Sequence, residues 1–122
     1  MSPLSRLENA VLEKILLQAA SNRLPLQEQL DGAFALNRQN TGAGFYTKLE
    51  TPYRSKLIDI RIIGNVFAHI SGLNHPMSFL LFTKSGLIET LEGASVDEDT
   101  RGIDFANVQF EMIEESNKRT SL

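Results

Sequence analysis

The chain has 122 residues, a formal net charge of −3 and no cysteine. This length fits one domain over residues 1–122, and the absence of cysteine excludes disulfides, thiolate metal sites and cysteine nucleophiles while favouring a reducing compartment. The bases are scattered rather than gathered into a basic surface, and no apolar run approaches the roughly 20 residues that span a bilayer, so we expect a cytoplasmic protein without nucleic-acid or membrane partners.

Two helices are predicted at the start of the sequence. Ser5 and Glu8 match a capping box, and apolar residues then recur at helical spacing, which predicts a first helix over Pro3–Ala20. A second helix is expected to begin at Pro25 and to stop at Gly32, because proline suits the first turn of a helix and glycine its end.

Alternating apolar and polar side chains predict strands in the rest of the chain, with a hairpin turn at Gly64-Asn65 and a polar, frayed tail over 114–122. Helices followed by hairpin-linked strands are typical of the α+β class. We therefore expect two N-terminal helices packed on one face of a mainly antiparallel sheet of about five to seven strands. The predicted strands are Phe34–Arg38, Gly44–Glu50, Ile58–Ile62, Val66–Ile70, Met77–Thr83, Leu87–Leu91 and Ala106–Met112.

The acidic segment that begins at Asp97 resembles the start of a calcium-binding loop. Oxygen ligands stand at its first and third positions and Gly102 at its sixth. Its fifth and twelfth positions hold Arg101 and Val108, which supply no carboxylate, so we expect a solvated loop and no metal.

The remaining candidate motifs are also incomplete. The glycines at 42 and 44 precede a strand rather than a helix, which is typical of a turn and not of a phosphate-binding loop. His69 and His75 are not expected to converge, and Glu89 and Glu92 should lie on opposite faces of a strand, unlike a paired acid and base. Because no serine stands in a nucleophile elbow either, we expect no catalytic residues and no cofactor.

The predicted sheet has a second face that two helices cannot cover. Apolar and aromatic residues alternate onto this face, and such an exposed surface usually marks a binding or oligomer interface. The alternative is that the loops Thr51–Lys56 and Leu73–Pro76 fold over it. The inner face is expected to receive the rows Ile58/Ile60/Ile62 and Val108/Phe110. The residues expected to bind a partner there are Tyr46, Lys48, Arg61, Phe67 and His69.

The acidic loop Ser95–Asp104 is the second candidate surface. Its carboxylates would complement a basic protein partner through electrostatic attraction. The residues expected to contribute are Asp97, Glu98, Asp99 and Asp104.

The segment Thr41-Gly42-Ala43-Gly44-Phe45-Tyr46-Thr47, followed by Gly72-Leu73, Gly86 and Leu91-Glu92-Gly93, resembles a family of small uncharacterised bacterial α+β proteins. The shared positions are turn glycines and strand residues over residues 7–93, so the resemblance implies a fold and carries no functional residue. In size, acidity and lack of catalytic motifs the chain is also similar in type to immunity proteins that neutralise contact-dependent toxins.

These observations favour a non-catalytic protein-binding module, with neutralisation of a basic bacterial toxin as the concrete version. Self-association through the uncovered face is another way of using the same surface. The alternative functions are a small-ligand-binding or metabolic accessory protein and, third, a hydrolase without a recognisable motif.

Overall fold

A computed structural model describes residues 2–114 of the chain, and in that range two α-helices precede a six-stranded sheet. This arrangement confirms the predicted α+β class. No helix among these residues is long and apolar enough to cross a membrane. The elements are α1 (Arg6–Leu17), the 3-10 helix η1 (Ala20–Asn22), α2 (Arg23–Asp31), β1 (Phe34–Asn40), β2 (Gly44–Glu50), β3 (Ile62–Ile70), β4 (Met77–Lys84), β5 (Leu87–Ala94) and β6 (Phe110–Met112).

Helix α1 begins at the predicted capping box. The Ser5 amide donates to Glu8 Oε1 at 2.8 Å, and the Glu8 amide donates to Ser5 Oγ at 3.1 Å. Each side chain thus accepts from the backbone N–H of the other residue, which has no partner within the helix. The helix ends at Leu17, before the predicted Ala20, which has a φ of 52° and opens a 3-10 turn instead. Helix α2 starts two residues before Pro25 and stops at Gly32 as expected.

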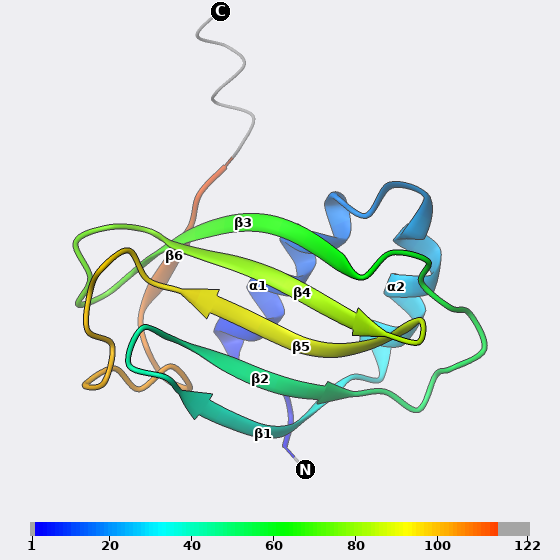
Figure 1. Cartoon of the computed structure of the whole chain (residues 1–122), viewed down its shortest axis with the longest axis horizontal. Coiled ribbons are helices and arrows are strands. Elements are labelled where there is room, and N and C mark those ends of the chain that lie inside the picture. Colours follow the sequence, from blue (N-terminus) through cyan, green and yellow to red (C-terminus); the bar gives the residue numbers. More distant parts are fainter. Residues whose placement is uncertain (1, 115–122) are drawn as a thin grey trace, which may run out of the picture.

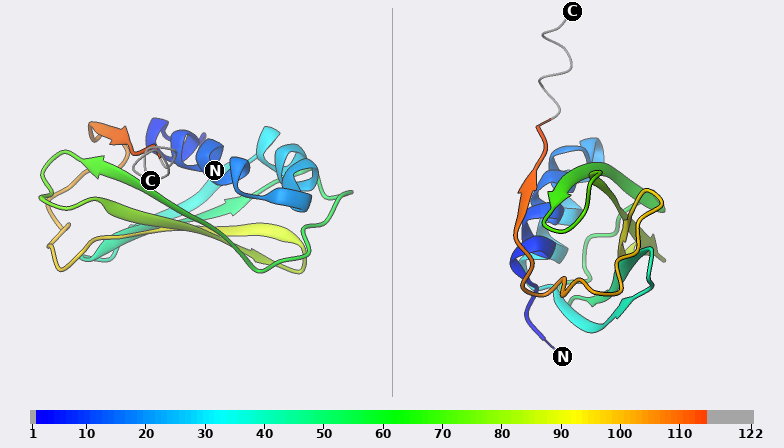
Figure 2. Two further views of the ribbon diagram at one scale, coloured as in Figure 1. Left: turned by 90° about the horizontal axis from the view of Figure 1, so that it is seen from above. Right: turned by 90° about the vertical axis from the view of Figure 1, so that its left-hand side faces the viewer.

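All strand pairs of the sheet are antiparallel, in the spatial order β1-β2-β5-β4-β3-β6. Figure 1 views the sheet with α1 and α2 behind it, and Figure 2 shows that the sheet curls around the helices, which lie on one face. We call the face toward the helices the inner face and the opposite one the outer face. The prediction of one helix-covered face is therefore confirmed.

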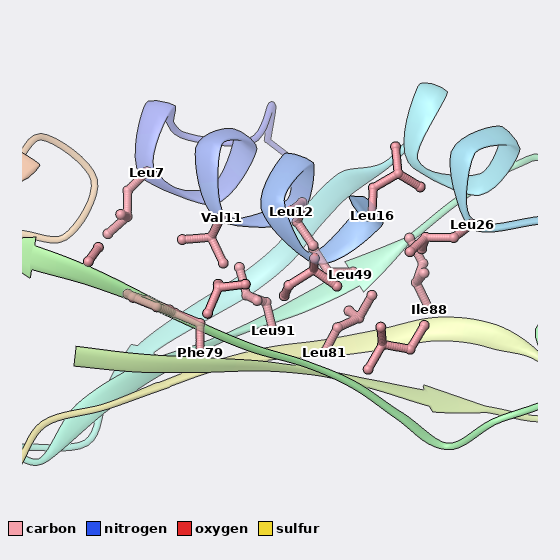
Figure 3. Packing of buried hydrophobic residues seen from close by; sticks show 14 of the residues in the cluster. Leu7, Val11, Leu12, Leu16, Leu26, Leu49, Phe79, Leu81, Ile88 and Leu91 are labelled. Atoms are coloured by element: carbon pink, nitrogen blue, oxygen red, sulfur yellow. The ribbon is translucent and has the colours of Figure 1, made fainter. Parts of the chain in front are cut away.

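The hydrophobic core lies between the helices and the inner face (Figure 3). Val11 and Ile15 of α1 are fully buried, and they pack into one cluster with Phe79, Leu81 and Leu91 from the central strands. The two helices and the sheet thus share a single core, which fixes the outer face as the side without a covering layer.

The predicted strand Ile58–Ile62 and the predicted hairpin at Gly64-Asn65 are both wrong. Strand β3 starts at Ile62 and runs through Gly64, where a bulge shifts its register against β4. Gly64 has a φ of 141°, and a Cβ there would lie 3.0 Å from the Phe79 carbonyl oxygen, so glycine serves the bulge rather than a turn. The bulge changes the alternation of β3, so that Ile63 is buried and Ile62 is 52% exposed. In the irregular segment before the strand, Ile58 is buried as expected, whereas Ile60 is 41% exposed.

The last predicted strand, Ala106–Met112, is also too long. Only Phe110–Met112 pairs with β3, and residues 104–109 form turns in which the Asp104 carboxylate accepts from the Ala106 amide at 3.1 Å. Alternation alone predicted a strand here, but the local side-chain acceptor turns the backbone away from the sheet.

Candidate functional site

The inner face contains a buried charge cluster. Glu8 is 2% exposed, and its two carboxylate oxygens accept from Arg38 Nε at 2.8 Å and from an Arg38 terminal nitrogen at 2.9 Å. The Thr47 hydroxyl donates to the same carboxylate. Burial by itself would raise the pKa of Glu8, but the hydrogen bonds from Arg38, Thr47 and Ser5 outweigh it and hold the pKa below its ordinary value of 4.5. The carboxylate therefore stays ionised and acts as a structural anchor rather than as a proton donor.

The acidic loop is tied to the β1–β2 hairpin by a second buried residue. Thr100 is fully buried, and its hydroxyl accepts from the Gly44 amide at 2.9 Å and donates to Asn40 Oδ1 at 3.0 Å. The Asn40 side-chain amide in turn donates to the Thr100 carbonyl at 2.7 Å. The loop is thus packed against the fold rather than extended into solvent.

Three of the four acids predicted to bind a partner instead satisfy groups of the chain itself. Glu98 accepts from the amides of Asn74 and His75, each at 2.8 Å, and these backbone bonds, Asn74 first, lower its pKa. Arg101 donates to Asp99 at 2.7 Å and lowers the pKa of Asp99 to about 2.

Asp104, the third of these acids, holds the turn described above. The fourth, Asp97, has a φ of 55° and stands at the surface. The carboxylates of the acidic loop are therefore largely used inside the fold, which leaves little free charge for a basic partner.

The two histidines lie apart, as expected. His75, in the loop between β3 and β4, lies beside Glu98 of the acidic loop, with Nδ1 and Oε2 3.3 Å apart, whereas His69 lies on β3 opposite Glu111 of β6. Within residues 2–114 no three histidine, aspartate or glutamate side chains gather in a way that could hold a metal ion.

The outer face carries a broad groove. Its volume is about 960 Å³, and it is open to solvent along the strands. Three residues predicted from the sequence line it, and the structure adds eight that the sequence did not indicate as a group. The groove is lined by Tyr46, Lys48, Arg61, Ile62, Phe82, Thr83, Lys84, Ser85, Glu89, Thr90 and Glu92; this set is called the outer-face groove below.

The strand register explains which side chains meet in the groove. Ile62 pairs with Phe82, Phe82 with Thr90, and Thr90 with Lys48, so one row crosses β3, β4, β5 and β2. In the next row, Gly64 pairs with Leu80, Leu80 with Glu92, and Glu92 with Tyr46. In these two rows the aliphatic and phenylalanine side chains therefore come from β3 and β4, whereas β5 and β2 contribute Thr90, Glu92, Lys48 and Tyr46.

Glu89 and Glu92 both line this groove, so their predicted placement on opposite faces is wrong. A register shift between Phe82 and Thr83 gives β5 an extra residue at this point, which changes the alternation of β5 side chains. Sequence spacing alone contained no signal for this bulge.

Several charges in the groove have no opposite charge beside them. Lys48 donates to the Thr90 hydroxyl at 3.1 Å, and the Lys48 ammonium lies 6.0 Å from the centre of the Tyr46 ring. Within residues 2–114, the side chains of Arg61, Lys84 and Glu89 form no ion pair and no hydrogen bond. Glu92 is likewise without such a contact in this part of the chain.

The alternative, in which the loops Thr51–Lys56 and Leu73–Pro76 fold over the outer face, does not agree with where these loops lie. The Thr51 hydroxyl donates to the Gln29 carbonyl of α2 at 2.8 Å, which fixes the loop after β2 on the helix side. The loop after β3 is held by Glu98, while its Leu73 packs on the core. The five side chains predicted to bind are consequently accessible to solvent, and none of them is buried. Tyr46, Lys48 and Phe67 are half-buried, and Arg61 and His69 are exposed.

Phe67 and His69 lie further along β3 than the groove, outside its lining. Their alternation with the buried Val66, Ala68 and Ile70 follows the prediction. The structure thus joins Tyr46, Lys48 and Arg61 in one site and places the two β3 residues beyond it.

Searches against protein-family models, curated proteins and solved structures find no match to the chain. The resemblance to small bacterial α+β proteins accordingly stays a prediction, and the functional argument rests on the geometry of the groove.

Proposed function

We propose that this chain is a non-catalytic binding module whose outer face engages a partner protein. The observation that carries the proposal is the outer-face groove itself, in which exposed apolar side chains stand beside unpaired charges on a sheet face without a covering layer. Protein interfaces combine an apolar centre with a polar rim in this way. A module of this kind positions its partner through surface contacts and needs no cofactor.

The apolar surface extends beyond the groove. Leu57 and Ile60, in the segment before β3, are 58% and 41% exposed, and Ile62 continues the series at the start of the strand. Leu57 packs against Gly86 of the β4–β5 turn, which keeps the segment beside the groove. Exposed apolar side chains that continue beyond the groove favour a protein partner over a small-molecule ligand.

Toxin immunity stays a narrower proposal within this function. The acidic loop offers it little support because its carboxylates serve the fold, so a toxin would be met by the outer face instead. We also keep the cytoplasm as the proposed location, since a chain without cysteine suits a reducing compartment.

A small ligand is the second candidate, because the groove volume of about 960 Å³ lies at the upper end of ligand sites. The groove differs from such sites in being open rather than enclosed, so a ligand would leave much of its surface in water. This difference favours the protein partner.

The experiment compares the native chain with Ile62→Asp in an affinity capture from the cells that produce it. The substitution puts a charge on an exposed apolar residue of the groove, and capture of the partner is expected to be lost. Leu24→Asp is the matched control, because Leu24 is 71% exposed on α2 and far from the outer face, and its capture should equal that of the native chain.

Both variants change exposed residues, so unfolding midpoints close to that of the native chain are expected and check that the fold is intact. Equal capture by both variants, or loss with Leu24→Asp alone, would contradict a binding site on the outer face.

A further inference from the structure

We infer that the outer face is self-complementary and binds a second copy of this chain, in a dimer whose two-fold axis runs along the strands between β4 and β5. This inference deepens the proposed function and rests on it, because it names the partner of the same surface. Its basis is the pattern of unpaired charges across the strands.

Charges of both signs occupy the outer face, separated by strand. Lys84 is on β4, and Arg61 directly precedes β3, with its carbonyl accepting from the Thr83 amide of β4 at 2.9 Å. Glu89 lies on β5 and Glu50 at the end of β2. Arg61 and Lys84 are therefore on one side of the β4–β5 boundary, and the acids lie on the other side together with one base, Lys48 of β2, so that the two halves carry opposite net charge.

A strongly acidic or strongly basic partner would leave half of these charges opposed by like charges. The complement of a mixed surface is another mixed surface with the two signs exchanged. Rotation by 180° about an axis in the face, parallel to the strands, makes that exchange for a second copy of the same chain. An isologous dimer requires this kind of self-complementarity.

The register then predicts the facing residues. The rotation places β4 of one copy over β5 of the other, and β3 over β2. Because Lys84 pairs with Leu87, the rotation sets Lys84 over the other copy's Leu87, from where its long side chain can extend to Glu89, two residues along β5. Arg61, just before β3, can extend in the same way to the other copy's Glu50 at the end of β2. Glu50 can turn toward Arg61 of the other copy, because its Oε2 lies 3.7 Å from the nearest terminal nitrogen of Arg54 and both side chains are exposed.

The same rotation also brings residues of the two cross-strand rows of the groove together. Ile62 lies over the aliphatic part of Lys48, which can cover apolar surface while its ammonium reaches water. In the neighbouring row, Tyr46 faces Gly64, where the missing side chain leaves room for the ring.

The size of the face predicts a weak dimer. Strand β4 has eight residues and so extends about 26 Å, and four strands span about 19 Å, which gives a projected area of roughly 500 Å². Stable interfaces bury about 800 Å² of accessible surface on each partner. Association is consequently expected to depend on protein concentration.

The test is a charge exchange measured by sedimentation velocity over a range of concentrations. One variant, R61E/K84E, carries acids on both sides of the axis; the other, E50K/E89K, carries bases on both sides. The native chain should show reversible dimers, each variant alone should remain monomeric, and an equimolar mixture should form dimers again. All three chains should have similar thermal unfolding midpoints, because the changed side chains are on the outer face.

Each outcome decides the inference. A native chain that stays monomeric at every concentration overturns it, as do variants that dimerise alone or a mixture that fails to restore the dimer. These results leave the proposed function standing if the Ile62→Asp capture still loses a partner that Leu24→Asp keeps. Failure of that capture together with a monomeric native chain would reject both.

Discussion

The two faces of this sheet treat charge in opposite ways. On the inner face the single carboxylate of Glu8 is buried, and hydrogen bonds from Arg38, Thr47 and Ser5 occupy it. On the outer face Arg61, Lys84 and Glu89 are left without an opposite charge within residues 2–114.

This difference teaches that the presence of charge says little about binding until its partners are known. The acidic loop shows the same point, because it carries four acids within residues 95–104 and yet Glu98 and Asp104 accept from backbone amides of the fold. Charges that the fold uses predict stability effects, and charges that it leaves free predict binding effects. The predictions below separate these two classes, in order of expected size.

The largest expected effect is the loss of stability in Glu8→Ala. Removing this carboxylate leaves Arg38 and Thr47 without their buried acceptor, which should lower the free energy of unfolding by about 3 kcal/mol. Glu89→Ala is the matched control on the outer face and should change it by less than about 0.5 kcal/mol. Urea denaturation followed by circular dichroism measures both, and similar losses in the two variants would remove the distinction between the faces.

Thr100→Val should give the next largest effect. The substitution keeps the shape of the side chain but leaves the buried Gly44 amide without its acceptor, at a cost of about 2 kcal/mol. Thr90→Val removes a hydroxyl from the outer face, where Lys48 remains in contact with water, and should cost much less. If Thr90→Val were the more harmful change in chemical denaturation, the anchoring role of Thr100 would be wrong.

The pH dependence of stability gives a smaller effect with a definite sign. Because the folded pKa of Glu8 is below 4.5, the unfolded chain takes up this proton first, and the stability from Glu8 is lost as the pH falls from 4.5 through the folded pKa. Asp99 adds to the loss between pH 3.8 and about 2. Glu8→Gln should therefore show a shallower decline below pH 4.5 than the native chain.

Glu89→Gln is the control for this profile and should keep the native slope, since the Glu89 side chain forms no ion pair and no hydrogen bond within residues 2–114. Unfolding curves at a series of pH values make the comparison. A native slope that survives in Glu8→Gln would assign the acid sensitivity to other groups.

The smallest expected effect is local. Glu98→Ala should free the amides of Asn74 and His75, so that their hydrogen exchange becomes faster while the rest of the chain is unchanged. Asp97→Asn, at the neighbouring position, should leave both rates as they are. Exchange measured by NMR tests the pair, and unchanged rates in Glu98→Ala would show that the carboxylate does not hold this loop.

Local signals in the sequence predicted much of the fold. The capping box fixed the start of α1, and strand β2 has the predicted bounds Gly44–Glu50, with Thr47 facing inward and Lys48 outward. These features depend on neighbours within a few residues of one another. The bulges at Gly64 and Thr83 depend on pairing with another strand, so alternation alone placed Ile62 on the wrong face and assigned Glu89 and Glu92 to opposite faces.

The site was predictable to a similar extent. Alternation on β2 indicated Tyr46 and Lys48, but their meeting with Lys84 and Glu89 requires the strand order β2-β5-β4, which no spacing in the sequence encodes. The pairing of Glu8 with Arg38 was missed for the same reason, since 30 residues separate them. Contacts between distant segments decide which charges are satisfied.

The chain has two tyrosines, and they allow the most direct test that binding uses the outer face. Tyr46 lines the groove, whereas Tyr53 lies away from it with its ring against Gly32, where an added Cβ would be 2.7 Å from the ring. In protein labelled with fluorotyrosine, the ¹⁹F resonance of Tyr46 should shift as the partner or a second copy binds, while that of Tyr53 stays in place. A shift of Tyr53 with no change at Tyr46 would contradict the outer face as the binding surface.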